Sequence, residues 1–218
     1  MDPERYYTDL ALAFVRGHRP ELAAAQADPA QVLEQARAAG LSLHKFKRNA
    51  TLPRVAKVLG ILHGLQPENL LDIGSGRGTF LWPLLDAFPG LEVTALDADP
   101  IRARDLQAVR DGGISRLRAI HGDVTALDMP DRSVAVVTAL EVLEHLETPA
   151  KAAAELLRVA RRFIVVSVPS KPDDNPQHIQ LFSPDSLRDM FMDAGARRVQ
   201  VDHVPGHMVA VVRLEDPR

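Results

Sequence analysis

Apolar positions along the chain follow two different periods. Over roughly the first 65 residues they recur every three or four positions, as at Val55, Leu59 and Leu62, and this spacing predicts amphipathic helices. After Pro67 the pattern changes to short apolar runs that alternate with helical stretches. Such alternation is typical of repeated strand-helix-strand units, which build a parallel sheet.

Three helices are expected before this change of pattern. The first contains Leu10 and ends near Gly17. The second has Asp28 as its candidate N-cap and Pro29 as its first helical residue, and Gly40 stops it. The third carries the apolar stripe described above.

Seven apolar runs after this point predict strands. They are Asn69–Ile73, Glu92–Asp97, Leu117–His121, Val134–Leu140, Phe163–Val168, Arg197–Val204 and Met208–Leu214. Helices are expected between them at Gly78–Phe88, Pro100–Asp111, Pro149–Ala160 and from Ser183 to near Gly195. Because Pro205-Gly206 separates the last two strands, they can pair as an antiparallel hairpin at one sheet edge. We therefore expect a doubly wound α/β fold with a seven-stranded, mainly parallel, Rossmann-like sheet over residues 67–218, preceded by a helical N-terminal cap over residues 1–66.

The composition narrows the functional classes. A hydrophobic share of 46% and a charged share of 25% are typical of a soluble folded chain. A formal charge of −3 leaves no whole-domain positive field for nucleic acid or an anionic membrane. No apolar stretch resembles a secretion signal or approaches membrane length. The absence of cysteine excludes disulfides and thiolate chemistry, and it is compatible with the reducing cytoplasm that we expect.

The strongest chemical signal is a glycine-rich turn. A predicted strand runs into Gly74, Gly76 and Gly78, and a predicted helix follows. Glycines here let the backbone turn tightly and let a ligand approach closely. A dinucleotide fingerprint would have a glycine at Thr79, and a phosphate-binding P-loop would have Lys and Ser or Thr where Thr79 and Phe80 stand. The pattern thus disfavours both of these ligand classes, although a purely structural turn stays open.

From Asp72 to Gly78 the chain resembles the first motif of the class I S-adenosylmethionine-dependent methyltransferases. Three further motifs resemble that family in the same order, ending at Asp97, at Asp123-Val124 and over Ala139–Leu146. The resemblance covers about residues 67–214 and implies S-adenosylmethionine as cofactor. It implies cofactor binding by Asp72, Gly74, Ser75, Gly76, Gly78, Asp97, Ala98, Asp123, Val124 and Leu140.

Two of these carboxylates have specific expected roles. The resemblance implies that Asp97 accepts hydrogen bonds from the ribose hydroxyls and that Asp123 lies beside the adenine amino group. Asp97 could instead cap the next helix, although Asp99 is better placed for that. Asp123 could simply cap the loop at Thr125. The fourth predicted strand departs from the family, because Ala135 stands where an Asp is usual.

Carboxylates and histidines gather after the fourth predicted strand. Glu141, Glu144 and His145 are spaced by three and four residues, so a helical strand exit would turn them to one side. Together with His178 they offer the oxygen and nitrogen ligands that suit Mg, Mn or Zn. Small-RNA 3′-end ribose methyltransferases and ubiquinone-pathway O-methyltransferases are similar here, which implies these four residues as metal ligands. Alternatively no metal binds, and Glu141 and His145 act as catalytic residues that orient the acceptor or remove its proton.

One local basic cluster precedes the sheet. It consists of Lys45, Lys47, Arg48, Arg54 and Lys57. With Phe46 for stacking it could bind an RNA end or an anionic acceptor, but a solvated helix face is the simpler interpretation. Phe46 and the N-terminal helices could also form a lid over the cofactor, and Trp82 is expected to be a packing residue.

These features predict a methyltransferase that transfers a methyl group to an acceptor, most simply a hydroxyl of a small molecule. A metal-dependent RNA 3′-terminal ribose 2′-O-methyltransferase is an alternative. A nicotinamide oxidoreductase on the same sheet and a noncatalytic cofactor-binding module are alternatives from other classes. No membrane partner is expected, and nothing in the sequence indicates an oligomeric state.

Overall fold

Seven strands form one sheet in the order β3-β2-β1-β4-β5-β7-β6 in a computed structural model that describes residues 3–23, 28–46 and 52–214. The strands are β1 Asn69–Ile73, β2 Glu92–Asp97, β3 Leu117–His121, β4 Val134–Leu140, β5 Ala160–Pro169, β6 Arg198–Val204 and β7 His207–Arg213. β1 pairs with β4, β2 with β3 and β4 with β5 in parallel, whereas β7 is antiparallel to both β5 and β6. The predicted mainly parallel α/β fold with an antiparallel C-terminal hairpin is confirmed.

Helices separate the strands as the sequence predicts. They are α1 Pro3–His18, η1 Pro20–Leu22, α2 Pro29–Ala38, α3 Pro53–Leu65, α4 Leu81–Ala87, α5 Pro100–Asp111, η2 Leu143–His145, α6 Pro149–Val159 and α7 Pro184–Asp193. Across the described ranges, no helix combines the length and apolarity needed to cross a membrane.

Three local predictions need correction. α4 begins at Leu81 rather than Gly78, because Gly78 has a φ of +80° and still belongs to the turn. Asp28 precedes α2, but its side chain makes no capping hydrogen bond. β5 begins at Ala160 rather than further along the chain, since α6 ends directly before it.

Contacts divide the chain into two compact units. Unit 1 comprises residues 1–50 and 75–121, and unit 2 comprises residues 51–74 and 122–218. The expected division between a helical cap over residues 1–66 and a cofactor-binding domain over residues 67–218 stays a prediction.

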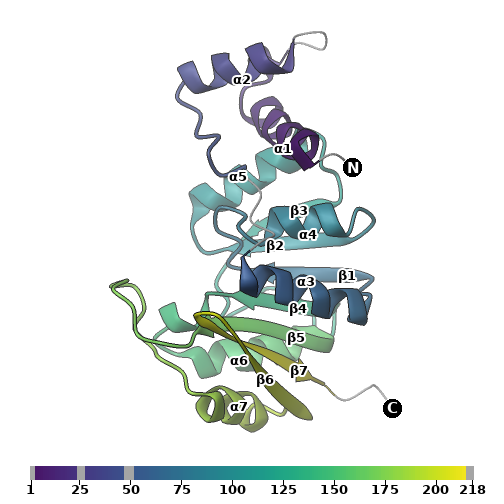
Figure 1. Cartoon of the computed structure of the whole chain (residues 1–218). Coiled ribbons are helices and arrows are strands. Elements are labelled where there is room, and N and C mark those ends of the chain that lie inside the picture. Colours follow the sequence, from purple (N-terminus) through teal and green to yellow (C-terminus); the bar gives the residue numbers. More distant parts are fainter. Residues whose placement is uncertain (1–2, 24–27, 47–51, 215–218) are drawn as a thin grey trace. The chain divides into compact units, whose positions relative to one another are not determined.

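Unit 1 contains the N-terminal helices together with β2, α4, α5 and β3. α5 packs on the β2–β3 pair, and α1 packs on α5 (Figure 1). Glycines allow the two helix backbones to touch: a Cβ at Gly17 would lie 2.0 Å from the carbonyl oxygen of Ala108, and one at Gly112 would lie 1.7 Å from that of Ala13. α1 is therefore an integral layer of this unit.

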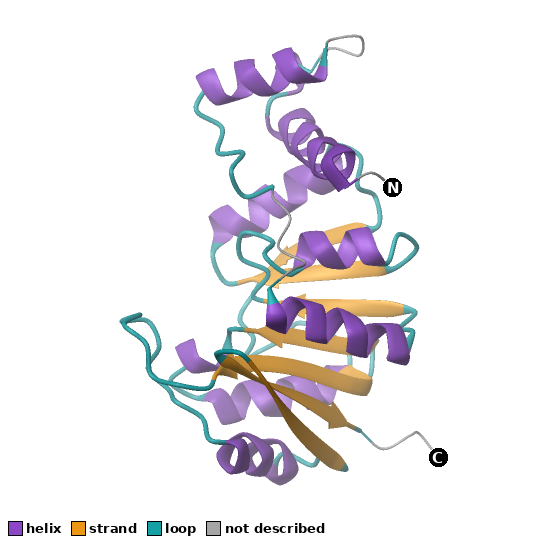
Figure 2. Ribbon diagram, viewed as in Figure 1, coloured by secondary structure: helices purple, strands orange, loops and turns teal. Residues whose placement is uncertain are grey.

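Unit 2 contains β1, β4, β5, β7 and β6, with α3 on one face and α6 on the other (Figure 2). All seven residues of β4 are buried, because helices cover both of its faces. Arg158 of α6 fastens the loop after β3, donating to the carbonyl oxygens of Leu127 and Met129 at 2.8 and 2.7 Å. It also pairs with Glu155, whose carboxylate accepts from the Leu127 amide at 2.8 Å.

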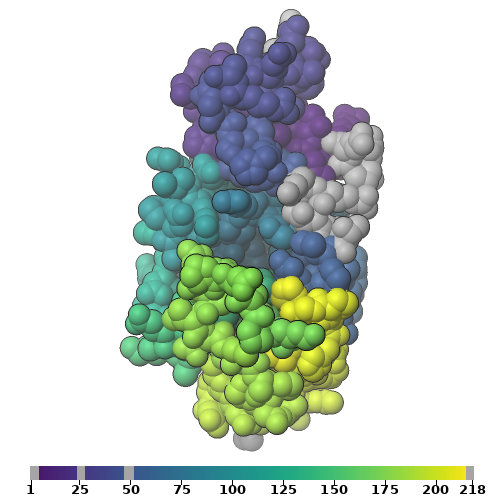
Figure 3. Space-filling view, turned by 60° about the vertical axis from the view of Figure 1, so that its left-hand side comes forward, coloured from purple at the N-terminus to yellow at the C-terminus, as the bar shows by residue number. Residues whose placement is uncertain are grey.

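The carboxyl ends of β4 and β5 lie at the same edge of unit 2 as the start of β7. We call this the carboxyl edge of unit 2. Pro169 pairs with His207 there, and the Ser170 amide donates to the carbonyl oxygen of Gly206 at 3.0 Å. The segment after β5, green in Figure 3, therefore lies beside the yellow hairpin on the surface. Parallel sheets bind ligands at this kind of edge.

Candidate functional site

The glycine turn of unit 1 is tied to the end of β2. Gly76 and Gly78 have φ values of +56° and +80°, so both positions favour glycine. The Gly76 amide donates to Oδ2 of Asp97 at 2.7 Å, and the Asp99 amide donates to Oδ1 at 3.0 Å. Each carboxylate oxygen can accept one more hydrogen bond. Asp97, which is only 3% exposed, is thus a fixed acceptor beside the turn.

The glycine turn also packs against the indole ring of Trp82. A Cβ at Gly78 would lie 2.1 Å from the Trp82 ring, so only glycine lets the ring pack there. The indole nitrogen of Trp82 donates to the carbonyl oxygen of Arg77 at 2.9 Å. Trp82 is 1% exposed, which confirms the predicted packing role.

In unit 2, Glu141 lies at the end of β4 in a strained backbone conformation. Its φ is +58°, in the left-handed region that non-glycine residues rarely adopt. The Ser167 hydroxyl donates to Oε1 of Glu141 at 2.7 Å, and His207 Nε2 lies 3.0 Å from Oε2. Arg54 Nε lies 3.9 Å from Oε1. Three separate elements, β5, β7 and α3, thus contact one half-buried carboxylate at the carboxyl edge of unit 2.

Glu144, His145 and His178 form a second cluster at this edge. One ligand atom from each lies within 4.8 Å of the others. The His145 and His178 rings contact edge to face with centroids 4.8 Å apart. The loop after β5 returns as predicted, since the amides of Ile179 and Gln180 donate to the Glu144 carbonyl oxygen at 2.9 and 3.1 Å. Three of the four predicted metal ligands are therefore together, and Glu141 is not part of this group.

The Glu144 carboxyl group is fully buried. The residue is 0% exposed, and among the described residues neither side-chain oxygen has a hydrogen-bond donor. Burial, and to a lesser extent the nearby Glu141 carboxylate, raises the pKa of Glu144 to about 8, which favours the neutral acid at neutral pH. Such an orphaned group needs a ligand or a proton to be stable there.

Both histidines of this cluster are oriented through Nδ1. His145 Nδ1 lies 2.9 Å from the carbonyl oxygen of Gln177, and His178 Nδ1 lies 2.9 Å from Oδ2 of Asp173. A proton on each Nδ1 satisfies these acceptors and leaves Nε2 with its lone pair. Metal-binding histidines are usually held in this way by a carbonyl or carboxylate.

Comparison with known proteins identifies the domain. Residues 71–163 match the family described as Methyltransferase domain. A crystal structure of a SAM dependent methyltransferase from Aquifex aeolicus superposes with a TM-score of 0.63 at 21% identity, covering 77% of this chain and 93% of that chain. Residues 71–163 are therefore a methyltransferase domain, and the chain shares its fold with a solved S-adenosylmethionine-dependent methyltransferase.

Two curated relatives match this chain in part. A malonyl-[acyl-carrier protein] O-methyltransferase of Methylococcus capsulatus is 35% identical over 103 residues, which cover 47% of this chain and 37% of that protein. A demethylmenaquinone methyltransferase of Renibacterium salmoninarum is 38% identical over 96 residues, covering 43% of this chain and 37% of that protein. The chain therefore matches little more than a third of the length of these relatives.

Other predicted cofactor residues of the methyltransferase domain divide between the two units. In unit 1, Ser75 is buried and Ala98 is exposed. In unit 2, Gly74 has a φ of +67° and packs against Val142, where a Cβ would lie 2.6 Å from a methyl group. The Asp72 carboxylate accepts from the buried Thr138 hydroxyl at 2.8 Å.

The remaining predicted cofactor residues also lie in unit 2. Leu140 and Val124 are buried. Oδ1 of Asp123 accepts from the amide and the hydroxyl of Thr125 at 2.8 and 2.9 Å. The loop cap considered from the sequence therefore exists, and adenine contact stays a prediction. Asp99, not Asp97, caps α5, because its side chain accepts from the Ile101 amide at 2.8 Å.

The described members of the basic cluster face carboxylates of the chain itself. Lys45 is paired with Asp105 at 2.5 Å and lies 3.9 Å from the Phe14 ring centroid. Burial lowers the pKa of Lys45 in spite of that pair. Arg54 faces Glu141 as described above, and Lys57 pairs with Asp202 at 2.7 Å. The interpretation as a solvated face is therefore wrong for Lys45. Lys47 and Arg48 lie outside the described residues.

Sequence reasoning missed the partners of Glu141. Ser167 and His207 come from β5 and β7, far along the chain, and only strand pairing brings them to β4. The one available signal was the position of His207 directly after the Pro205-Gly206 turn.

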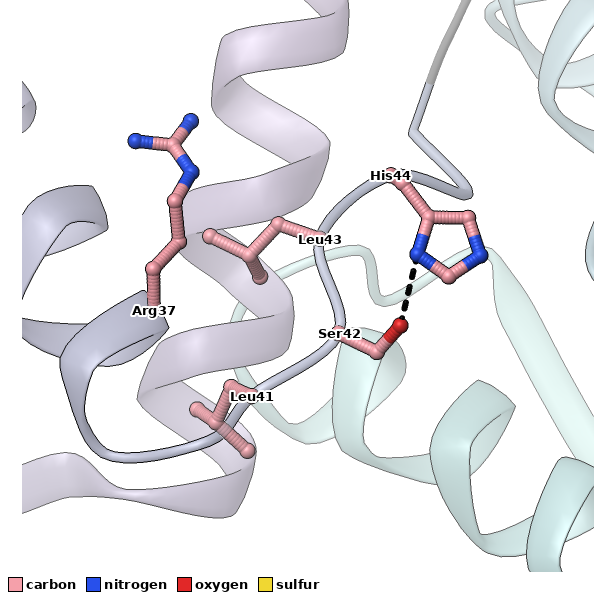
Figure 4. Close-up of a pocket in the computed structure, with 5 residues that line it drawn as sticks. All are labelled: Arg37, Leu41, Ser42, Leu43 and His44. Atoms are coloured by element: carbon pink, nitrogen blue, oxygen red, sulfur yellow. Dashed lines mark hydrogen bonds between the residues drawn. The ribbon is translucent and has the colours of Figure 1, made fainter.

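A surface pocket of about 330 Å³ is lined by residues that were not predicted as site residues (Figure 4). They are Arg37, Leu41, Ser42, Leu43 and His44. The Ser42 hydroxyl lies 2.8 Å from His44 Nδ1, and no other polar pair joins the residues drawn. This hollow carries no chemistry that methyl transfer requires.

Proposed function

We propose that the protein transfers the methyl group of S-adenosylmethionine to a hydroxyl of a small-molecule acceptor. The observation that carries the proposal is the Asp97 carboxylate held by the Gly76 amide within a methyltransferase domain. A fixed carboxylate beside a glycine turn suits the two adjacent hydroxyls of a ribose. The sequence prediction that Asp72, Gly74, Asp123 and their neighbours also contact the donor is part of this proposal.

Methyl transfer makes modest demands on the protein. The acceptor oxygen forms a bond to the methyl carbon while the carbon–sulfur bond breaks, and its electron pair stays on sulfur to give S-adenosylhomocysteine. The acceptor also loses its hydroxyl proton. Alignment of donor and acceptor can supply roughly 7–11 kcal/mol of the barrier. The chain therefore mainly has to position both molecules and accept one proton.

Glu141 and His145 are the proposed proton acceptors. The Glu141 side chain is 22% exposed, and His145 retains a free Nε2 when Nδ1 donates to the Gln177 carbonyl oxygen. Both groups therefore remain open to a bound hydroxyl. His207 and Ser167 hold the Glu141 carboxylate in one orientation, which general base catalysis requires.

We also propose that Glu144, His145 and His178 can hold a divalent ion. Three observations support the fit: the buried carboxyl of Glu144 without a hydrogen-bond partner among the described residues, the Nδ1 contacts that leave Nε2 of both histidines as a ligand atom, and the closeness of the three groups. Two imidazoles and one carboxylate suit Zn or Mn better than Mg, which prefers oxygen ligands. A bound ion would lower the pKa of an acceptor hydroxyl. Glu141 is better explained as a neighbouring base than as a fourth ligand.

A small-molecule acceptor is favoured over RNA. The two curated relatives are named for an acyl-carrier malonyl group and for demethylmenaquinone, not for RNA. In addition, Lys45 and Arg54, which could have contacted phosphates, pair with carboxylates of the chain itself. RNA methylation therefore becomes one outcome of the test.

The functional test has two stages. Calorimetry should first show binding of S-adenosylhomocysteine to the purified protein. S-adenosylhomocysteine release should then be measured with a panel of phenols, carboxylic acids and alcohols, and with RNA that carries a free 3′ end. Turnover with a hydroxylated small molecule supports the proposal. Labelling of RNA alone would overturn the acceptor class, and binding without turnover on any panel or extract would indicate a noncatalytic module.

The ion is tested separately. Metal-free protein is titrated with Mn and followed by electron paramagnetic resonance. We expect binding that His178→Ala and Glu144→Gln abolish and that His207→Ala leaves unchanged, because His207 faces Glu141 instead. Equal binding by the wild type and the Glu144→Gln variant would exclude this ion site. Full turnover in EDTA would exclude a catalytic role for the ion.

A further inference from the structure

Aromatic side chains connect α1 and Phe46 to the glycine turn of unit 1. We call the chain from α1 to Phe46 the N-terminal segment. The Phe46 ring packs on Trp82 with centroids 5.4 Å apart, and on Phe14 of α1 at 5.2 Å. Trp82 in turn fills the space beside Gly78. A continuous row of rings therefore runs from α1 to the turn.

Polar contacts fix both ends of this row. The Tyr6 hydroxyl of α1 donates to the Trp82 carbonyl oxygen at 3.0 Å. Asp105 of α5 accepts from Lys45 at 2.5 Å, and its other oxygen lies 2.9 Å from His18 Nε2. Lys45 is adjacent to Phe46, so this ion pair holds the Phe46 ring in its place. The segment is thus locked by groups from both α1 and α5.

The last ring of the row, Trp82, contacts the backbone of the glycine turn. The indole nitrogen of Trp82 holds the Arg77 carbonyl oxygen, and the Trp82 amide donates to the Gly78 carbonyl oxygen at 3.1 Å. The turn amide of Gly76 is the one that reaches Asp97. A displaced indole would shift the peptides on either side of Gly78, and a small shift of a preorganised site weakens binding.

We infer that Trp82 is a positioning residue of the donor site and that Phe46 makes donor affinity depend on the docking of the N-terminal segment. The inference rests on the proposed function, because it requires the glycine turn to bind the donor. It assigns the segment before the sheet a role in donor binding that differs from a lid. Phe46 would support the glycine turn through Trp82 whether or not an acceptor is bound.

The test measures donor binding and needs no acceptor. Binding of S-adenosylhomocysteine is measured by calorimetry for Phe46→Leu, Trp82→Phe and the double variant. Each single change should weaken binding by about three- to tenfold, the range for loss of an aromatic pair. The fold loss of affinity in the double variant should be smaller than the product of the two single losses, since both changes break the same contact between Phe46 and Trp82.

A matched control separates positioning from general stability. Phe191 of α7 is 0% exposed and belongs to unit 2, so Phe191→Leu should lower the thermal midpoint while leaving donor affinity unchanged. Trp82 is the sole tryptophan of the sequence, and its emission should change when the donor binds. Phe46→Leu should reduce that change at saturating donor.

The outcomes are distinct. Folded Phe46→Leu protein that binds S-adenosylhomocysteine as tightly as the wild type would overturn the inference alone. A wild-type protein that binds none would overturn the proposed function and the inference together. If Phe191→Leu weakened binding as much as Phe46→Leu, the effect would be one of stability, and the inference would be wrong.

Discussion

His207 Nε2 lies 3.0 Å from Oε2 of Glu141, so the first residue of β7 holds the first residue after β4. Glu141 has a positive φ, and its carboxylate also accepts from the Ser167 hydroxyl. Backbone strain of this kind costs about 1–3 kcal/mol and persists when the surroundings enforce it. The pairing therefore points to a carboxylate that is held for chemistry rather than for packing.

Replacing Glu141 by Gln should slow methyl transfer by about 100-fold, the lower range for loss of a general base. Donor affinity and Mn binding should not change, because Glu141 lies outside the Glu144 cluster. His207→Ala should reduce turnover less, and it should move the pH profile of kcat, because the imidazole that contacts the base is lost. Steady-state kinetics with the acceptor found by screening will check this. If the pH profile of His207→Ala matched that of the wild type, His207 would not be a positioning residue for Glu141.

Replacing Asp97 by Ala should weaken donor binding about tenfold or more, because hydrogen bonds to a charged acceptor contribute about 1.5–3 kcal/mol. Asp99→Ala is the matched control two residues away, since it removes the cap of α5 and costs about 1 kcal/mol of stability. Calorimetry with S-adenosylhomocysteine distinguishes the two. Equal affinities for the Asp97 variant and the wild type would refute the ribose assignment.

Gly78→Ala should destabilise the protein by about 1–3 kcal/mol through backbone strain, and contact with the Trp82 ring adds to that cost. Gly90→Ala is the control, because a Cβ there meets nothing within 4 Å. Urea unfolding followed by circular dichroism measures both. A Gly78→Ala variant as stable as Gly90→Ala would mean that the turn tolerates a side chain.

In metal-free protein, Glu144 should make stability fall as the pH rises. Its folded pKa is about 8, whereas the unfolded value is about 4.3. Below pH 4 the carboxyl is neutral in both states, and above that range only the unfolded state gains by ionising, until the folded pKa is passed. Thermal midpoints in EDTA from pH 5 to pH 9 should therefore decline, and Glu144→Gln should flatten the decline. The exposed Glu147→Gln should follow the wild type instead.

Glu155 should show the opposite pH dependence. Its hydrogen bonds with Arg158 lower the pKa of the carboxyl group. The pair therefore contributes stability above the unfolded pKa of Glu155, and that contribution is lost as the pH falls through the lower folded value. Glu155→Gln should lower the thermal midpoint by about 3 °C at neutral pH and by less at pH 3. A midpoint deficit that does not depend on pH would exclude this origin.

The sequence predicts the framework closely because each strand is a short apolar run between turn residues. β1, β2, β3 and β4 begin and end where the pattern places them. The glycine turn, the Asp97 strand end and the Asp99 cap are equally local features, so a window of a few residues contains their signal.

Features that depend on distant parts of the chain are not predictable in this way. The helical spacing of Glu141 and Glu144 suggests one shared ligand set, but the left-handed backbone at Glu141 turns that carboxylate toward His207 and Ser167. These contacts follow from the pairing of β5 with β4 and β7. The packing of Phe46 on Trp82 likewise depends on α1 and α5.

The close backbone approach at Gly17 and Gly112 bears on how the protein can be shortened. Removing the chain before residue 67 would strip α1 from α5 and leave the surface around Ala108 and Gly112 facing water. Such a fragment would keep every predicted cofactor residue and yet invite self-association. Variants for crystallisation or binding work therefore need to retain the first helix, even though no proposed donor contact lies in it.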